Sequence, residues 1–445
     1  MTLIKIDLLL NCKWIIPIVP ENQTFTDCAI AINNGRIVGL LPQAEAAQKF
    51  SAKKVENLDR HIIMPGLVNS HGHAAMSLLR GYADDLPLRS WLENHIWPAE
   101  AKFLSEEFVR DGTRLSIAEM IKSGTTCFAD MYFFDEVIAT EVRNTGVRSQ
   151  IGFTVLDFPT PYGKDADDYI HKGLALRDNY KDQSLIKIAC APHAPYSISD
   201  RALSILATYA NELDMAVHIH CHESASEITE SLQTYDCRPI ERLEKLGLLL
   251  PQTQLVHMTQ ITTEDIALVR DHNCHIMHCP QSNLKLANGF CPVMKFIDSE
   301  VNVALGTDSA ASNNDLDLFS EIQSASLLAK AVSGDAASLD AHAALRLATI
   351  NGARALAWDN EIGSLETGKQ ADIIAVKIDS ISQQPLYNPA SQLVYTNSGS
   401  QVSHSWVAGK MLLENNQLCT INERSLIQTI EQWRKKIHPN QSRFD

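Results

Sequence analysis

The chain has 445 residues, of which 45% are hydrophobic and 20% charged, so it can bury a large core like an ordinary globular protein. Its formal net charge of −15 argues against nucleic-acid polymers and anionic membranes as partners, because both attract a basic surface. Ten cysteines are too few for a disulfide framework, and no apolar run is long enough to span a membrane, so we expect a cytoplasmic protein with reduced thiols.

Both ends of the chain have the pattern of short β-strands. An Asn-Gly turn at residues 34–35 separates two apolar runs, which is a strong signal for a hairpin. A similar alternation of apolar runs and turns returns at residues 368–413. We therefore expect residues 1–64 and 365–420 to pair into one small β-sandwich domain. A helix and a frayed tail are expected at residues 421–445.

Between these ends, residues 65–364 alternate apolar strands with amphipathic helices, a pattern that favours βα units and a parallel sheet. Strands are predicted at residues 63–70, 125–130, 148–154, 186–191, 215–220, 254–257, 275–278 and 302–306. Helices are predicted at residues 106–122, 199–212, 261–271 and 341–356, among others. Eight strands suit a closed (β/α)8 TIM-type barrel of the α/β class, which would carry its chemistry where the strands end.

Histidines and acidic residues follow several of these predicted strands. His71 and His73 come at the end of the first strand, and their spacing of two places both imidazoles on one side of an extended chain. Other strand ends carry His220 with Glu223, His257, and Asp308. Each residue alone is equally compatible with a satisfied polar group at a strand terminus. Together, at the mouth of one barrel, they predict a site for a divalent metal of the zinc or iron kind.

The order His-x-His, His-x-x-Glu, His and Asp on successive strands resembles the amidohydrolase superfamily. Within it, the chain is most similar to deaminases of methylthioadenosine and S-adenosylhomocysteine. Further matching segments are Leu-Leu-Arg-Gly-Tyr-Ala-Asp-Asp at 78–85, Trp-Pro-Ala-Glu at 97–100, His-Cys-Pro-Gln-Ser-Asn-Leu-Lys-Leu at 278–286, and Gly-Thr-Asp-Ser-Ala-Ala-Ser-Asn-Asn at 306–314. The resemblance covers nearly the whole chain and implies a barrel enzyme that hydrolyses a C–N bond of an adenine nucleoside.

The resemblance also implies the ligands of one divalent ion, most often zinc, with iron or manganese as alternatives. They are His71, His73, His220 and Asp308. Binuclear relatives carry a carboxylated lysine at the end of the fourth strand; here Lys187 lies too far upstream, so one metal is expected.

Two other groups of residues compete for this assignment. His218 shares the strand face of His220 and could be a further ligand or a core residue behind the site. The histidines and cysteines at residues 272–279 resemble a zinc cluster by number, although His275 and His278 face opposite sides of a short strand.

By the same resemblance, three residues handle protons. Asp308 takes a proton from the attacking water and passes it to the leaving ammonia, while His257 hydrogen-bonds the hydroxide. Glu223 protonates N1 of the purine, and the product is the inosine analogue. A positioned acid or base of this kind contributes about 10²–10⁴-fold in rate.

Besides Glu223, four residues are expected to contact the substrate. Glu100 matches the acceptor of the ribose 2′ and 3′ hydroxyls, although it could instead cap the helix that follows Pro98. His193 matches a substrate-contacting histidine. Arg148 could meet the carboxylate of a homocysteine tail or form a salt bridge, and Trp91 could line the substrate cavity or serve packing.

Two alternatives to a nucleoside deaminase stay open. One is an aminohydrolase or chlorohydrolase that acts on a free purine, pterin or triazine ring, which would leave Glu100 without a ribose to bind. The other is a barrel scaffold without catalysis. The sequence does not rank methylthioadenosine, S-adenosylhomocysteine and adenosine, and the resemblance implies a homodimer or homotetramer.

Overall fold

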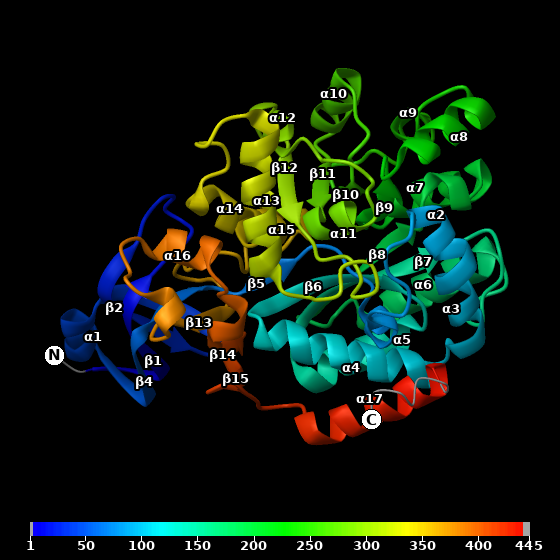
Figure 1. Ribbon diagram of the computed structural model, residues 1–445. Coiled ribbons are helices and arrows are strands. Elements are labelled where there is room, and N and C mark those ends of the chain that lie inside the picture. The colour runs from blue at the N-terminus through cyan, green and yellow to red at the C-terminus, as the bar shows by residue number, and fades with distance from the viewer. Residues whose placement is uncertain (1–2, 439–445) are drawn as a thin grey trace.

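The computed structural model describes residues 3–438, and its centre is a parallel barrel (Figure 1). Its strands, in sheet order, are β5 (Leu67–Asn69), β6 (Thr125–Tyr132), β7 (Arg148–Val155), β8 (Ile186–Pro192), β9 (Val217–Cys221), β10 (Thr253–His257), β11 (His275–His278) and β12 (Asn302–Leu305). All neighbours in this order pair in parallel. The Ser70 amide donates to the Leu305 carbonyl over 2.9 Å, which links the last strand to the first. The predicted (β/α)8 barrel is confirmed.

Helices connect the strands and cover the outside of the barrel (Figure 1). Those between β5 and β9 are η1 (Ala74–Leu79), α2 (Leu88–Trp91), η2 (Leu92–Ile96), α3 (Trp97–Phe103), α4 (Glu106–Lys122), α5 (Asp135–Thr145), α6 (Ala166–Tyr180), η3 (Pro195–Ser197) and α7 (Asp200–Glu212). Those that follow are α8 (Ala225–Tyr235), α9 (Pro239–Lys245), α10 (Thr263–Asp271), α11 (Pro280–Lys285), α12 (Val293–Asp298), α13 (Leu318–Ser333), α14 (Ala341–Leu347) and α15 (Ile350–Ala355). Every residue of β6 and β7 is buried, as expected for strands covered on both faces.

The two ends of the chain build a second sheet beside the barrel (Figure 1). Its strands, in order, are β16 (Gln417–Leu418), β15 (Lys410–Glu414), β14 (Val402–Val407), β13 (Ile373–Lys377), β4 (Phe50–Pro65), β1 (Ile4–Ile15), β2 (Phe25–Asn33) and β3 (Arg36–Pro42). The ends meet where β13 pairs antiparallel with β4. The predicted pairing of the chain ends is confirmed, while the domain limits drawn from the sequence stay a prediction.

Short helices complete the second sheet and the end of the chain. They are α1 (Gln43–Lys49), η4 (Ile381–Gln383), α16 (Pro389–Tyr395), η5 (Gly399–Gln401) and α17 (Glu423–Ile437). The indole nitrogen of Trp433 in α17 donates to Asp111 of α4 over 2.9 Å, which fixes this helix on the barrel. The last part of the predicted helix and tail, residues 439–445, lies outside the described residues. Among residues 3–438, no helix combines the length and apolar character needed to cross a membrane.

The first barrel strand is shorter than the sequence predicted. Met64 and its apolar neighbours belong to β4, and the barrel strand β5 begins only at Leu67. Between them Gly66 lies so close to Thr126 that a Cβ atom would stand 2.0 Å from the Thr126 hydroxyl oxygen. The bend therefore requires glycine and delivers the next residues, including His71, to the barrel mouth.

Candidate metal centre and substrate cavity

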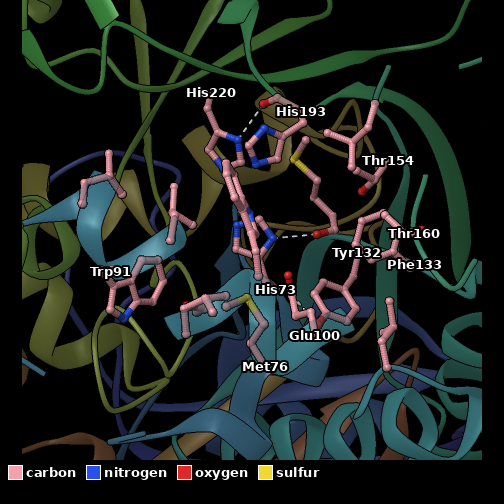
Figure 2. A pocket seen from close by; sticks show the side chains of 18 of the residues that line it. His73, Met76, Trp91, Glu100, Tyr132, Phe133, Thr154, Thr160, His193 and His220 are labelled. Atoms are coloured by element: carbon pink, nitrogen blue, oxygen red, sulfur yellow. Dashed lines mark hydrogen bonds between the residues drawn. The ribbon is translucent and has the colours of Figure 1, made fainter. Parts of the chain in front are cut away.

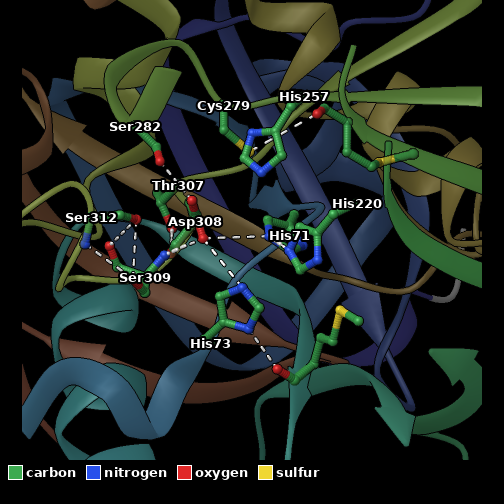
Figure 3. Close-up of polar contacts among 12 residues, drawn as sticks. His71, His73, His220, His257, Cys279, Ser282, Thr307, Asp308, Ser309 and Ser312 are labelled. Carbon is green, nitrogen blue, oxygen red and sulfur yellow. Dashed lines mark hydrogen bonds and ion pairs between the residues drawn. The ribbon is translucent and has the colours of Figure 1, made fainter. Parts of the chain in front are cut away.

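Three histidines and one aspartate meet at the carboxyl end of the barrel (Figure 3). The Nε2 atoms of His71 and His73 lie 3.5 and 3.3 Å from Asp308 Oδ1. His220 Nε2 lies 3.3 Å from His71 Nε2. A tetrahedron with metal–ligand bonds of about 2.0–2.1 Å has edges of about 3.3 Å. The three separations match such edges, and the donor atoms that lie within 4.8 Å of one another form two overlapping groups, His71–His73–Asp308 and His71–His220–His257.

Hydrogen bonds hold two of these imidazoles in the tautomer that a metal needs. His73 Nδ1 lies 2.6 Å from the Met131 carbonyl, and His220 Nδ1 lies 2.7 Å from the His193 carbonyl (Figure 2). A carbonyl oxygen only accepts, so each Nδ1 carries the proton and donates it. The lone pair of each Nε2 consequently faces the other ligands.

A longer chain of hydrogen bonds decides the tautomer of His71. Gln254 Nε2 donates to the Ala355 carbonyl over 2.8 Å, which turns Gln254 Oε1 toward His218 Nδ1 at 2.6 Å. His218 must therefore donate from Nδ1 and accept at Nε2, where His71 Nδ1 lies 2.7 Å away. His71 thus donates from Nδ1 and presents the Nε2 lone pair to the ligand cluster. His218 therefore lies behind the site as a core residue, which is one of the two roles that the sequence left open for it.

The electrostatics of the cluster favour a bound cation. Burial lowers the pKa of His71 and of His220 well below the usual range, so both rings are neutral, as metal ligands must be. Burial also lowers the pKa of His73, but the hydrogen bond and charge of Asp308 outweigh it and raise this pKa to about 9. The space between His73 and Asp308, which stabilises a proton, also attracts a metal ion. The residues present fit the predicted divalent metal.

Two consecutive residues of α11 hold the other proposed proton-handling groups. Ser282 Oγ donates to Asp308 Oδ2 over 2.6 Å, and His257 Nδ1 lies 2.8 Å from Asn283 Oδ1. The backbone of His257 and Asp308 is left-handed, with φ of 75° and 61°, and such strain is typical of functional sites. The sequence reasoning assigned no role to Ser282 or Asn283, although both lie in the matching segment at 278–286.

Glu223 faces His257 at the same end of the cavity. Its Oε1 lies 3.7 Å from His257 Nε2 and accepts a hydrogen bond of 2.9 Å from Asn288 Nδ2. Burial raises the pKa of Glu223 above its usual value, so the carboxyl group holds a proton more readily than an exposed glutamate. Asn288 is a further residue that the sequence did not single out.

A cavity of about 260 Å³ opens from this cluster. The predicted site residues that line it are His73, Trp91, Glu100, His193, His220, Glu223, His257 and Asp308. The first five of these are labelled in Figure 2. The few polar groups among apolar walls are typical of a site for a small organic ligand. No lysine lines it among the described residues, and Lys187 instead donates to the Ala357 carbonyl.

Glu100 of α3 is half-buried beside Tyr132. The Tyr132 hydroxyl donates to Glu100 Oε1 over 2.6 Å. Burial raises the pKa of Glu100 to about 7, while the Tyr132 hydrogen bond works in the opposite direction. Nothing in the sequence marked Tyr132, which is a buried residue at the end of β6. His193 is half-buried on another wall, where desolvation and the charge of His73 lower its pKa to about 4.

The substrate role predicted for Arg148 is wrong. Arg148 is the first residue of β7, at the opposite end of the barrel from the cavity, and only 1% of its surface is exposed. Its guanidinium donates to both oxygens of Asp372, over 3.0 and 3.2 Å, and to the Ser184 carbonyl over 3.1 Å. The histidines and cysteines at residues 272–279 do not form a metal-type cluster among the described residues. His275 Nδ1 instead lies 3.1 Å from the Asn302 amide nitrogen.

Comparison with known proteins agrees with this geometry. The profile of the amidohydrolase family matches residues 62–412. The chain belongs to the amidohydrolase family. This amidohydrolase is 50% identical to a 5-methylthioadenosine/S-adenosylhomocysteine deaminase from Teredinibacter turnerae over 97% of its length and 98% of that protein. It is 48% identical to the protein of the same description from Saccharophagus degradans, over 97% of each.

Among solved structures, an adenosine deaminase from Xanthomonas campestris with bound zinc is similar to this chain. It is 44% identical, with a TM-score of 0.97 over 98% of this chain and 100% of that one. An atrazine chlorohydrolase from Arthrobacter aurescens, also with zinc, has a TM-score of 0.89 at 22% identity, over 96% and 99% of the two chains. At that identity the likeness shows the fold alone.

Proposed function

We propose that this amidohydrolase is a zinc-dependent deaminase of adenine nucleosides. It hydrolyses the C6 amino group of 5′-methylthioadenosine, S-adenosylhomocysteine or adenosine, giving the inosine analogue and ammonia. The observation that carries the proposal is the junction of a metal-type cluster with a nucleoside-sized cavity holding Glu223 and Glu100. The deaminases at 50% and 48% identity, and the zinc-containing adenosine deaminase at 44%, support it.

In this proposal His71, His73, His220 and Asp308 hold one divalent ion, most favourably zinc. When bound, the ion supplies a Lewis acid that lets a water molecule lose its proton near neutral pH. Iron and manganese suit the same ligands, so metal analysis decides between them.

The chain's own groups move the remaining protons. Asp308 accepts the proton of the attacking water and later gives it to the departing ammonia, while Ser282 orients its other oxygen. Glu223 keeps a proton because burial raises its pKa, and it donates that proton to N1 of the purine, which makes C6 electrophilic. His257, which donates from Nδ1 to Asn283, offers Nε2 as an acceptor to the water.

The cavity walls supply recognition. Glu100, oriented by Tyr132, accepts the hydrogen bonds of the ribose 2′ and 3′ hydroxyls. A substrate without ribose leaves this half-buried carboxylate without those partners, which disfavours free bases. His193 contacts the substrate, and Trp91 forms part of the apolar wall.

An ammonia-release assay on the purified, zinc-loaded protein tests the proposal. The panel contains adenosine, methylthioadenosine, S-adenosylhomocysteine, guanine and a chlorotriazine, with metal analysis on the same sample. We expect turnover of the nucleosides and about one metal per chain. Preferred turnover of guanine or the triazine would favour a free-ring hydrolase, and metal-loaded protein inactive on the whole panel would favour a scaffold.

Two further expectations stay predictions. All ten cysteines are free and eight are buried, which supports the expected cytoplasmic location because such thiols persist in a reducing compartment. The homodimer or homotetramer expected from the resemblance can be checked by size-exclusion chromatography with light scattering.

A further inference from the structure

Glu223, the proposed proton donor, lies in a short bend between a strand and a helix. β9 ends at Cys221 and α8 begins at Ala225, so residues 222–224 form this bend. His222 within it has a left-handed backbone, with φ of 53°, a strained conformation that persists only where the surroundings hold it. The place of the Glu223 side chain therefore depends on the groups that bind the backbone of the bend.

The carboxyl group of Glu227 binds two amides of this bend. Glu227 lies in the first turn of α8 and is 5% exposed. Its Oε1 accepts from the His222 amide over 3.0 Å, and its Oε2 accepts from the Glu223 amide over 2.7 Å. Burial raises the pKa of Glu227 to about 8, but both oxygens accept an N–H group, which favours the ionised form. A buried carboxyl group is thus compensated by the two amides that it fixes.

The carbonyl groups of the same bend are bound by a different segment, the residues that follow β10. The Thr259 amide donates to the His222 carbonyl over 3.0 Å, and the Thr259 hydroxyl donates to the Glu223 carbonyl over 2.8 Å. The Gln260 amide donates to the same His222 carbonyl over 3.1 Å. The backbone at His222 and Glu223 is therefore held at its amides by α8 and at its carbonyls by this segment.

The side chain of Glu223 has an anchor of its own, Asn288. Asn288 is 8% exposed, and its Nδ2 donates to Glu223 Oε1 over 2.9 Å. Its backbone is fixed, because its amide donates to the Asn283 carbonyl over 2.9 Å and its carbonyl accepts from Gln260 Nε2 over 2.6 Å. A protonated carboxyl group accepts best at its carbonyl oxygen, so this contact assigns that role to Oε1 and leaves the acidic hydrogen on Oε2.

We propose that Glu227 and Asn288 are positioning residues for Glu223: Glu227 fixes its backbone, and Asn288 selects the carboxyl oxygen that delivers the proton. The inference rests on the proposed function, because it concerns the residue that donates to N1 of the purine. Among the described residues that line the substrate cavity, neither Glu227 nor Asn288 occurs, so each acts through Glu223. An error of about 1 Å in the place of a reacting group can cost about 10²-fold in rate.

Steady-state kinetics of Glu227→Gln with methylthioadenosine, on the zinc-loaded protein, test the backbone contact. The new side chain keeps the size but offers one acceptor oxygen, and its NH₂ group cannot accept from the second amide. We expect kcat to fall about 10–100-fold, while KM stays within about twofold and zinc content stays at the wild-type level. Glu241→Gln is the matched control, because Glu241 Oε2 accepts from the Arg238 amide over 2.8 Å at the start of α9. It should leave kcat unchanged.

Asn288→Ala tests the side-chain contact in the same assay. The change removes the donor to Glu223 Oε1, so the acidic hydrogen can reside on either oxygen. We expect kcat to fall at least about tenfold with KM within about twofold of the wild type. Asn179→Ala is the matched control, because Asn179 Nδ2 also donates to a glutamate, Glu136, over 3.0 Å at an exposed position. Unchanged kcat in Asn288→Ala or in Glu227→Gln would reject the role of that residue.

A double-mutant cycle separates positioning from a general loss of structure. In Glu223→Gln the proton donor is already missing, so adding Glu227→Gln or Asn288→Ala should lower kcat by less than about twofold further. A further loss as large as in the wild-type background would show that these residues support the fold and not Glu223, and would overturn the proposal while leaving the proposed function in place. Absence of turnover of every nucleoside by the wild type would overturn the proposed function itself, and the inference with it.

Discussion

At the scale of single residues, the site depends on which atom of each side chain carries a hydrogen. The carbonyls of Met131 and His193 can only accept, and so they turn the Nε2 lone pairs of His73 and His220 inward. Neither carbonyl is recognisable in the sequence, because a backbone group has no residue type. The ligand types were predictable, whereas their protonation pattern was not.

Glu223→Gln tests the proposed proton donor. The amide keeps the shape and the Asn288 contact but cannot donate an acidic proton to N1. We expect kcat to fall by about 10²–10⁴-fold while zinc content stays at the wild-type level. Ammonia release and metal analysis on the same sample measure both, and a variant with nearly normal turnover would remove Glu223 from this role.

Glu100→Gln tests the ribose contact through its pH dependence. Because the pKa of Glu100 is raised to about 7, the carboxyl takes up a proton as pH falls and loses an acceptor for the ribose hydroxyls. We therefore expect KM for methylthioadenosine to rise between about pH 8 and about pH 6 in the wild type. Glu100→Gln should raise KM at every pH and flatten this profile, and an unchanged slope would assign the titration elsewhere.

His218→Leu tests the hydrogen-bond chain behind His71. The change removes the acceptor for His71 Nδ1, so His71 no longer has a fixed tautomer. We expect zinc affinity to fall by about 10–100-fold, measured by competition with a chelator. His218→Gln keeps an acceptor oxygen and should recover much of that affinity. Equal affinities in His218→Leu and the wild type would show that this chain is dispensable.

At the scale of secondary-structure elements, the proposed metal ligands lie at the ends of strands, and close contacts between helices and strands fix their positions. The predicted barrel strands agree closely with the observed ones, because buried parallel strands form short, continuous apolar runs in the sequence. The predicted helix at 341–356 is divided into α14 and α15. The reason is tertiary: Asn351 Nδ2 donates to the Val303 carbonyl over 3.0 Å, and Gly352 lies against Val68 of β5.

Gly112→Ala tests the contact between α4 and η1, the helix that directly follows His73. A Cβ atom at Gly112 would stand 2.3 Å from the Ala75 carbonyl oxygen, so one backbone must move. We expect a loss of about 1–3 kcal/mol in unfolding free energy. Zinc affinity should fall with it, because η1 shifts next to His73. Arg110→Ala, on the same helix but with its side chain 44% exposed, should leave zinc affinity unchanged; parallel loss in both variants would reject the explanation.

At the scale of the whole molecule, the second sheet is attached to the end of the barrel opposite the candidate metal centre. The Arg148–Asp372 pair joins β7 of the barrel to the segment leading into β13, with both side chains 2% exposed. Asp372 Oδ1 also accepts from the Ala408 amide over 2.7 Å. This buried ionic contact between distant parts of the chain explains why an arginine at a barrel strand is unrelated to substrate binding.

Arg148→Met tests this structural assignment. Removing one partner leaves the Asp372 carboxylate buried without its counter-charge, so we expect a loss of about 3–5 kcal/mol of stability. The kcat/KM ratio between methylthioadenosine and S-adenosylhomocysteine should stay that of the wild type. Arg201→Met breaks a solvent-exposed pair with Asp167 and should hardly change the unfolding midpoint. A selective effect of Arg148→Met on S-adenosylhomocysteine would restore the substrate role.

The sequence by itself predicted the barrel, the pairing of the chain ends and a metal-type group of residues that includes His71 and His73, because apolar periodicity and the spacing of these two histidines are local properties of the chain. Only the tertiary structure decided which polar residues share the cavity. Arg148 and His193 both belong to barrel strands or their ends, yet one lies at the start of its strand and the other just after its end. Likewise Tyr132, Ser282 and His218 acquire their partners only when distant strands meet, since hydrogen bonds across a barrel leave no pattern in the sequence.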